Sequence, residues 1–285
     1  MLSASPEPKP PSVQWRCPPI RPLTGAEGDR AVALYDRARR IEAASGHPAR
    51  LAGFELEVTL RLLEGTLPLP EADNPYWRDK CRTLFARPAV EPIAYLHWRA
   101  LMTGGIDGPG ALRIASMLAA RNVVLREGPG IGRSVMGDVE FEAADPQCSW
   151  LVEVRAATAS PELLPALPMF AFARAITAHP FSDSNGRFAR LLVQAGLARA
   201  GRLTRPCLPL APIFYRNNET LAAGLKRLSE EGEWGPYYDA CLGALEQAAL
   251  AAERMFLDTR EGAAPKAGPA ASRINSNSNM SGRGD

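Results

Sequence analysis

We begin from twelve residues beyond the middle of the chain, which read His179-Pro180-Phe181-Ser182-Asp183-Ser184-Asn185-Gly186-Arg187-Phe188-Ala189-Arg190. Proline disfavours the helical conformation in the residue before it, so one helix is expected to end at His179. Asp183, Ser184 and Asn185 offer side chains that can cap the helix that follows. The stretch therefore predicts a helix, a tight loop and a second helix.

The residue types in this stretch favour a site for a phosphorylated ligand. A loop that enters a helix presents unpaired N–H groups, and the helix dipole favours an anion there. Arg187 and Arg190 are spaced i and i+3, on one helix face, so both are expected to reach such an anion. Asp183 offers a carboxylate for Mg²⁺ beside the phosphates. His179, with an ordinary pKa of about 6.5, is a candidate general base.

The alternative is a surface helix–loop–helix in which Asp183 caps a helix, the arginines are solvated and His179 is structural. For any one of these residues alone this alternative is favoured, because clustered polar residues mark sites only probabilistically. For the whole set we favour the phosphate site.

The same residues resemble the signature of the Fic (Fido) family, H-x-F-x-[DE]-G-N-G-R-x-x-R. Seven of the eight specified positions match, and the departure is Ser184, which stands where the family has Gly. If the loop requires a positive φ there, the Cβ of serine is disfavoured. The resemblance implies a mainly α-helical fold, with a Fido helical core, a small β-hairpin flap and additional N-terminal helices.

The resemblance also implies a role for each matching residue. His179 would be the general base and Asp183 the Mg²⁺ ligand. The positions that would bind nucleotide and phosphate are Ser184, Asn185, Gly186, Arg187 and Arg190. The tyrosine pair that would hold the base is missing from its usual place, and Tyr237-Tyr238 comes later in the chain.

The activity implied by the resemblance is that of a protein adenylyltransferase, which transfers AMP from ATP to a hydroxyl side chain of a target protein, with Mg²⁺ as cofactor. A Fic-type phosphotransferase or a de-AMPylase would use the same site. A catalytically impaired module that only binds a nucleotide or a partner is a third alternative. The target protein and the choice of ATP over another nucleotide are not encoded in any motif that we recognise.

Residues 122–144 change character and predict a β-hairpin. Glycines recur there, and apolar residues alternate at Val135, Val139 and Phe141. By resemblance we place the flap at residues 132–141, where a target protein would dock by strand addition. A plain surface loop is the alternative.

A second resemblance concerns residues 51–65, which are expected to form a helix that ends at Glu64-Gly65. Fic proteins with an inhibitory helix carry [ST]-x-x-x-E-[GN]. Here the Glu and Gly fit, whereas Leu60 stands at the Ser/Thr position. The resemblance implies that Glu64 pairs with Arg190 and blocks the γ-phosphate position. A solvated Glu at a helix end is an equally weighted alternative.

Composition shifts divide the chain into four parts. Prolines crowd residues 1–28, which we expect to be a disordered arm. An N-terminal helical region is expected at 29–91, the Fido core at 92–258 and a disordered tail at 259–285. Helices are predicted over 76–87, 92–102, 111–121, from 160 to 179, 187–200, 213–228 and 237–256.

Length, composition and charge limit the class of protein. The 285 residues suffice for a well-buried core, and 46% apolar with 22% charged residues is ordinary for a soluble globular protein. A formal charge of +2 gives no overall attraction to nucleic acid or an anionic membrane, so we expect neither as a partner. The five cysteines lack metal-binding spacing, which argues against zinc.

The N-terminus carries no apolar signal segment, and nowhere do about eighteen apolar residues run together. We therefore expect a cytoplasmic protein, with delivery into a host cell left open. The sequence predicts no oligomeric state.

Overall fold

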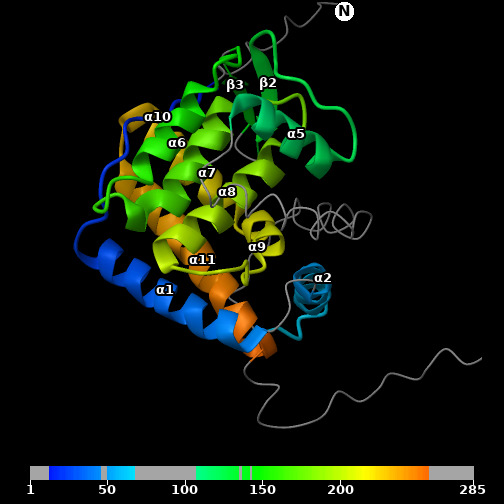
Figure 1. The fold of residues 1–285 in the computed structure, drawn as a ribbon, viewed down its shortest axis with the longest axis vertical. Coiled ribbons are helices and arrows are strands. Elements are labelled where there is room, and N and C mark those ends of the chain that lie inside the picture. The colour runs from blue at the N-terminus through cyan, green and yellow to red at the C-terminus, as the bar shows by residue number, and fades with distance from the viewer. Residues whose placement is uncertain (1–12, 46–49, 68–106, 135–136, 142, 257–285) are drawn as a thin grey trace, which may run out of the picture.

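The computed structural model describes residues 13–45, 50–67, 107–134, 137–141 and 143–256 (Figure 1). Most of these residues are helical and a small sheet accompanies them, which confirms the predicted mainly helical fold with a β-hairpin. The helices predicted at 76–87 and 92–102, the boundary at 91–92 and the tail at 259–285 lie outside the described residues.

Helices make up most of the described residues, and the three strands among them occur in only two places along the sequence. The strands are β1 (Val13–Gln14), β2 (Gly130–Ser134) and β3 (Gly137–Phe141). The helices are α1 (Gly25–Ser45), α2 (Arg50–Leu63), α5 (Gly108–Ala119), α6 (Ser149–Ala157), α7 (Leu167–Ala178), α8 (Asn185–Gly201), α9 (Leu210–Arg216), α10 (Asn218–Glu231) and α11 (Trp234–Phe256).

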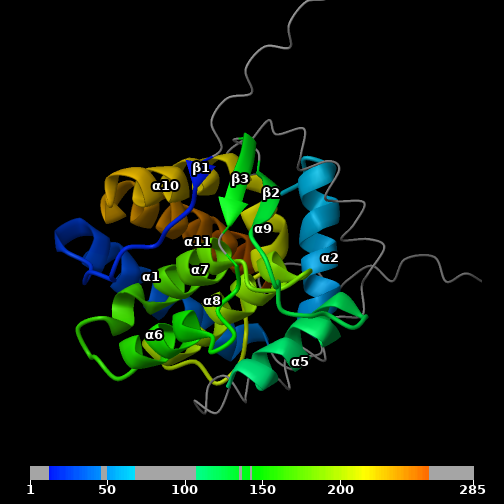
Figure 2. The ribbon, with the colours of Figure 1, turned by 90° about the horizontal axis from the view of Figure 1, so that it is seen from above.

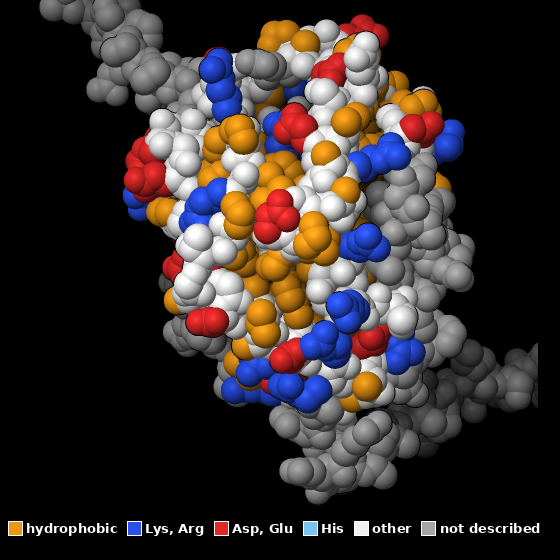
Figure 3. Space-filling view, turned by 60° about the vertical axis from the view of Figure 1, so that its left-hand side comes forward, with side chains coloured by type: hydrophobic (Ala, Val, Ile, Leu, Met, Phe, Trp, Pro, Cys, Tyr) orange, Lys and Arg blue, Asp and Glu red, His pale blue; other side chains and the backbone are white. Residues whose placement is uncertain are grey.

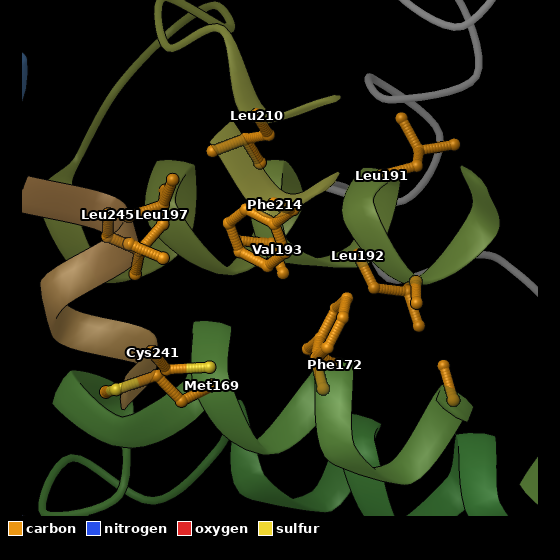
Figure 4. Packing of buried hydrophobic residues seen from close by; sticks show 14 of the residues in the cluster. Met169, Phe172, Leu191, Leu192, Val193, Leu197, Leu210, Phe214, Cys241 and Leu245 are labelled. Carbon is orange, nitrogen blue, oxygen red and sulfur yellow. The ribbon is translucent and has the colours of Figure 1, made fainter. Parts of the chain in front are cut away.

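The helical pair α7 and α8 forms the centre of the core. Both helices bury most of their residues, and α11 and α1 pack outside them. Figure 4 shows Phe172 of α7 beneath Phe214 of α9, with Leu192 and Val193 of α8 beside them. The Phe172 and Phe214 rings lie edge to face with centroids 5.0 Å apart, an arrangement favoured by the ring quadrupoles.

The close approach of α7 and α8 depends on Gly196. A Cβ at this position would lie 2.7 Å from the Cα of Pro168, which is backbone and cannot move aside. The missing side chain therefore sets how tightly the two helices pack.

Ion pairs join α1 to α11 along the outside of the bundle. Arg30 Nε lies 2.8 Å from Glu246 Oε1, and Arg37 Nε lies 3.0 Å from Glu253 Oε1. On the face drawn in Figure 3, acidic and basic side chains are interspersed with apolar ones, in keeping with the small net charge. Within the described ranges, no helix combines the length and the apolar character needed to cross a bilayer.

The prediction of a disordered arm over residues 1–28 is wrong for its second half. Residues 13–24, which we call the N-terminal strap, are held in place, and α1 begins at Gly25 rather than at residue 29. The Arg16 amide donates to Ser229 Oγ (3.0 Å), and Trp234 Nε1 donates to the Pro19 carbonyl (2.9 Å). Prolines exclude regular structure here, but an extended proline-rich segment can still dock on a folded surface.

Two helix boundaries also differ from expectation. Ser160 does not start a helix, because its carbonyl accepts from Leu163 in a turn (3.0 Å) and α7 begins only at Leu167. The single helix predicted at 213–228 is divided at Asn217, whose side chain donates to Gln247 of α11 (3.0 Å). Helix α6 was not predicted, since its apolar residues gain their burial from tertiary packing, on α7 and, through Trp150, on Phe181 and Phe188.

The sheet has the strand order β1-β3-β2 (Figure 2). Strands β2 and β3 form the antiparallel hairpin expected at 132–141, with Gly132 opposite Val139. Strand β1 of the strap pairs in parallel with β3, placing Gln14 beside Glu140. The hairpin therefore gains a third strand from the beginning of the chain.

The glycine contact gives a test of this packing. We expect Gly196→Ala to lower the free energy of unfolding by about 1–3 kcal/mol, because the new methyl group overlaps the Pro168 backbone. Gly243→Ala in α11 is the matched control, since a Cβ there meets nothing within 4 Å. It should be neutral or stabilising by about 0.5–1 kcal/mol. Urea unfolding of both variants measures the difference, and equal effects would contradict the close approach of α7 and α8.

Candidate functional site

The predicted helix–loop–helix is present between α7 and α8. Helix α7 ends at Ala178, and His179 follows it in the left-handed conformation with φ 41°. The His179 amide donates back to the Ala175 carbonyl (3.1 Å), which completes the last turn of the helix. Helix α8 begins at Asn185, after the five-residue loop 180–184.

Asn185 closes this loop through its side chain. Its Oδ1 accepts from the Phe181 amide (3.0 Å), and its Nδ2 donates to the Phe181 carbonyl (2.7 Å). Asn185 is buried, so this pair of hydrogen bonds forms away from water. The side chain is thereby committed to the shape of the loop, and only the backbone of Asn185 is left to contact a ligand.

Ser184 is the residue before α8, and it does not cap the helix as predicted. Its backbone lies in the left-handed region, with φ 68° and ψ 8°, so the positive φ expected at this departure from glycine is present. The hydroxyl makes no capping hydrogen bond, and its buried Oγ has no partner among the described residues. The strained conformation is one that glycine adopts more easily.

The first turn of α8 retains its capacity to bind an anion. The amides of Asn185 and Gly186 stand at the first two positions of the helix, where no intrahelical acceptor exists. The guanidinium group of Arg190 leans back toward this turn, because a Cβ built on Gly186 would lie 3.6 Å from Arg190 Nη1. One guanidinium group therefore lies beside the first turn of α8, whose amides and dipole favour an anion.

A segment that precedes the hairpin fixes the loop from its other side. The Arg126 amide donates to the Pro180 carbonyl (2.9 Å), and the Ser182 amide donates to the Val124 carbonyl (2.9 Å). Leu125 and Phe181 form an antiparallel bridge between these bonds. Because this segment leads directly into β2, the hairpin and the loop are held at a fixed distance.

His179 lies between the hairpin and the loop, where its side chain is half-buried and its Nδ1 atom is enclosed. Its ring is stacked on Phe141 of β3, with centroids 4.1 Å apart and planes 18° from parallel. Arg126 Nε donates to the His179 carbonyl (2.5 Å) and brings a positive charge close to the imidazole. Burial lowers the pKa of His179 to about 4; the Arg126 charge acts in the same direction, and the Ile176 carbonyl opposes both. The imidazole is therefore neutral at pH 7 and can accept a proton.

Asp183 lies between two arginines. Its Oδ2 accepts from Arg121 Nε (3.0 Å) and Nη2 (2.6 Å), while its Oδ1 accepts from the Ser184 amide (2.5 Å) and lies 3.5 Å from Arg187 Nη2. Burial raises the pKa of Asp183, but the hydrogen bonds from Arg121 and Ser184 and the charge of Arg187 outweigh it, so the pKa is lowered overall. Asp183 is an ionised carboxylate at neutral pH.

The two arginines of the stretch are not brought onto one partner. Arg187 contacts Asp183 and donates to the Leu118 carbonyl at the end of α5. Arg190 turns toward α9, where its Nη2 donates to Tyr215 Oη (3.2 Å) and its Cζ lies 4.6 Å from the Tyr215 ring centroid. One guanidinium group therefore lies toward α5 and the other toward α9, with the first turn of α8 between them.

The donor set limits what metal this site can hold. No group of three or more His, Cys, Asp or Glu side chains that suits a metal occurs in the part of the chain that the structure describes. Asp183 is a single carboxylate, which suits Mg²⁺ that is shared with phosphate oxygens. Arg121 now occupies Oδ2, but it is 65% exposed and such pairs contribute about 1 kcal/mol or less. A cation bound together with phosphates can therefore displace it.

Glu64 does not make the contact that the resemblance implies. It is exposed just beyond α2, and among the described residues no ion pair joins it to Arg190, which instead contacts Tyr215. Helix α2 meets the rest of the molecule at α9, where Glu55 Oε1 accepts from the Ala211 amide (3.3 Å). An inhibitory role for Glu64 stays a prediction.

The late tyrosine pair is structural. Tyr237 Oη donates to the Met169 carbonyl (2.7 Å) and Tyr238 Oη to the Arg21 carbonyl (2.8 Å), and both rings are fully buried. They are committed to the core and the strap, and they are not placed to hold a ligand.

Four residues that contact the site were not predicted as site residues from the sequence, namely Arg121, Arg126, Phe141 and Tyr215. Arg121 contacts Asp183 across 62 positions of sequence, and no local spacing could have indicated this pair. Phe141 was placed in the hairpin, but its contact with His179 depends on the register of β3 against β2. Only the fold brings these side chains to the loop.

Comparison with known proteins supports the fold. No protein-family model and no curated protein matches the sequence. Among solved structures, the crystal structure of a Fic family protein from Desulfovibrio desulfuricans G20 at 2.70 Å resolution is similar, with a TM-score of 0.51 and 19% sequence identity. The similarity covers 86% of this chain and 78% of that chain. At this identity the likeness shows a Fic-like fold, and the chemistry must be argued from the site.

The buried imidazole predicts a pH dependence of stability. Below about pH 6.5 the unfolded chain binds a proton at His179 that the folded chain does not bind until about pH 4. Stability should therefore fall as the pH is lowered through this window. Between pH 7 and pH 5 we expect the wild type to lose about 2 kcal/mol more free energy of unfolding than His179→Gln. Urea unfolding at both pH values measures this difference; parallel curves for the two proteins would contradict a buried neutral imidazole.

Proposed function

We propose that this chain is a protein adenylyltransferase of the Fic type, which transfers AMP from ATP to a hydroxyl side chain of a target protein. The observation that carries the proposal is that one loop holds a neutral imidazole and an ionised carboxylate and leads into the first turn of α8, where no side chain caps the helix among the described residues. The likeness of the fold to a Fic family protein supports a transferase in general terms.

His179 would act as the general base. A hydroxyl of the target loses its proton to the imidazole while its oxygen attacks the α-phosphorus of ATP. The new bond joins the target oxygen to phosphorus, the bond from the α-phosphorus to the bridging oxygen breaks, and pyrophosphate leaves. A pKa of about 4 leaves the imidazole unprotonated at pH 7, which is the form that accepts a proton, and it also makes this base weaker than one whose pKa lies near the working pH.

The phosphates would bind at the first turn of α8. The amides of Asn185 and Gly186 and the guanidinium group of Arg190 can receive negative charge there without moving far. Mg²⁺, held by Asp183 together with phosphate oxygens, would neutralise further charge. Most of the rate enhancement in phosphoryl chemistry comes from such positioning and charge neutralisation, and rigid packing of α7 on α8 serves both.

The hairpin would present the target. In our proposal an extended segment of the target protein pairs with the flap near residues 132–141 and places its hydroxyl beside His179. Strand β3 is paired on both sides, with β1 and β2, so the edge left for such pairing among the described strands is that of β2. This edge carries the exposed side chain of Ile131.

Labelled ATP tests the reaction. Incubation with Mg²⁺ and α-labelled ATP should label the protein itself or a target, whereas γ-labelled ATP should not. His179→Ala should reduce labelling by about 100-fold or more, which is the contribution expected of a general base. Arg113→Gln is a control that changes charge on an exposed residue of α5. Transfer from the γ-position would indicate a phosphotransferase, loss of AMP from a modified protein a de-AMPylase, and binding without transfer an impaired module.

The same assay tests Glu64. If Glu64 reaches Arg190 during the reaction cycle, Glu64→Gln should raise labelling several-fold because the γ-phosphate position is freed. Glu57→Gln on α2 is the matched control, since Glu57 is exposed and forms an ion pair with Arg61 of the same helix (2.8 Å). Equal labelling by the wild type and both variants would rule out inhibition by Glu64.

A further inference from the structure

The N-terminal strap reaches the candidate site through the sheet. Strand β1 pairs with β3 at Val139 and Glu140, and the Trp15 amide donates to the Glu140 carbonyl (3.4 Å). This pairing turns Trp15 toward the hairpin, where its side chain is only 8% exposed. A residue from the start of the chain is thus buried beside the strand that carries Phe141.

Three rings then follow one another from the strap to the loop. Trp15 meets Phe141 edge to face, with centroids 6.3 Å apart and planes at 86°. Phe141 in turn stacks on His179 at 4.1 Å. The edge-to-face geometry of Trp15 and Phe141 is one that aromatic pairs favour. Phe141 therefore connects the imidazole of His179 to Trp15 of the strap.

The position of the middle ring is defined by its neighbours. A Cβ at Gly132 on β2 would lie 2.6 Å from Phe141 Cε2, so the absence of a side chain there gives the ring its place under the hairpin. The guanidinium group of Arg126 lies over the ring, with Cζ 5.6 Å from its centroid. Trp15 is the third neighbour of this ring, with its plane at 86° to that of Phe141.

The strap is anchored far from the hairpin as well. Ser229 Oγ of α10 donates to the Arg16 carbonyl (2.7 Å), and Tyr238 Oη of α11 donates to the Arg21 carbonyl (2.8 Å). These bonds fix the segment next to Trp15 to the helical core. Trp15 is thus held by the core on one side and by β3 on the other.

We propose that Trp15 is a positioning residue of the site, which holds Phe141 against His179 and so fixes the orientation and the dryness of the imidazole. The coupling between these residues follows from the contacts above, whereas its importance for catalysis rests on the proposed function. The charged group that faces His179 is Arg126, from the segment before β2, and the polar group from α7 is the Ile176 carbonyl.

Removal of the indole should loosen this arrangement. Trp15→Ala leaves a cavity at the edge of Phe141, and a cavity lets the neighbouring ring move. Water then reaches the imidazole, and the desolvation that now lowers the pKa of His179 is relieved. The pKa should rise from about 4 toward its ordinary value of about 6.5.

An NMR titration of the full chain tests the proposal without any ligand. The three histidines are His47, His97 and His179, and the spectrum of His179→Gln identifies the third. We expect the pKa of His179 to rise by about one pH unit or more in Trp15→Ala, and to stay near the wild-type value in Trp15→Phe, which keeps an aromatic edge. Ile20→Ala is the matched control, because Ile20 is half-buried on the same strap away from β3.

The titration can either support or overturn the role of Trp15. An unchanged pKa in folded Trp15→Ala overturns the proposal, and so does an equal rise in Ile20→Ala, which would indicate general loosening of the strap. If Trp15→Ala does not fold, Trp15→Leu replaces it, with a rise in pKa supporting the proposal and no change refuting it. Because the titration uses neither ATP nor a target, it can succeed even if AMP transfer is disproved.

Where transfer is observed, its pH profile gives a second readout. The acidic limb of kcat should move to higher pH in Trp15→Ala and return to the wild-type position in Trp15→Phe. The KM for ATP should stay the same, because Trp15 acts on the site through Phe141 and His179 and not through the first turn of α8. A change in KM alone, with the acidic limb unmoved, would contradict a positioning role.

Discussion

The pair of hydrogen bonds between the Asn185 side chain and the Phe181 backbone is the constraint on which the site depends. It closes a five-residue loop between two buried helices, and the backbone accommodates the closure by adopting positive φ at His179 and Ser184. Neither residue adopts this conformation without cost, so the packing of α7 on α8 must maintain it. The geometry of the candidate site is thereby held by the core of the molecule.

Electrostatics around the loop follow from this closure. His179 is brought into a dry environment beside Arg126, which disfavours its charged form, whereas Asp183 is placed between Arg121 and Arg187, which favours its charged form. The surroundings of these two titratable groups, four residues apart, thus favour the neutral form of His179 and the ionised form of Asp183. The first form can accept a proton and the second can hold a cation. Such divergence within a single loop is typical of acid–base sites.

The beginning of the chain contributes more to this region than its composition indicates. Prolines exclude helix and sheet over most of the strap, yet hydrogen bonds to Ser229, Trp234 and Tyr238 fix it on the helical core. Its first residues add a strand to β3, so that among the strands that the structure describes β3 is paired on both sides and β2 forms an edge of the sheet. The strap, the hairpin and the loop form one continuous packed unit.

Local sequence was sufficient for the helix–loop–helix, the hairpin and the mainly helical fold, because proline, glycine and apolar periodicity act on the residues beside them. Local sequence also identified His179, Asp183 and the start of α8 as a group, because all of them lie close together in the short stretch from His179 to Asn185. Only the tertiary structure decided the partners of that group, namely Arg121 on Asp183, Phe141 on His179 and Tyr215 on Arg190. The reason is physical: each of these contacts joins residues 25 to 62 positions apart, and burial and strand register, which determine the contacts, are properties of the assembled core.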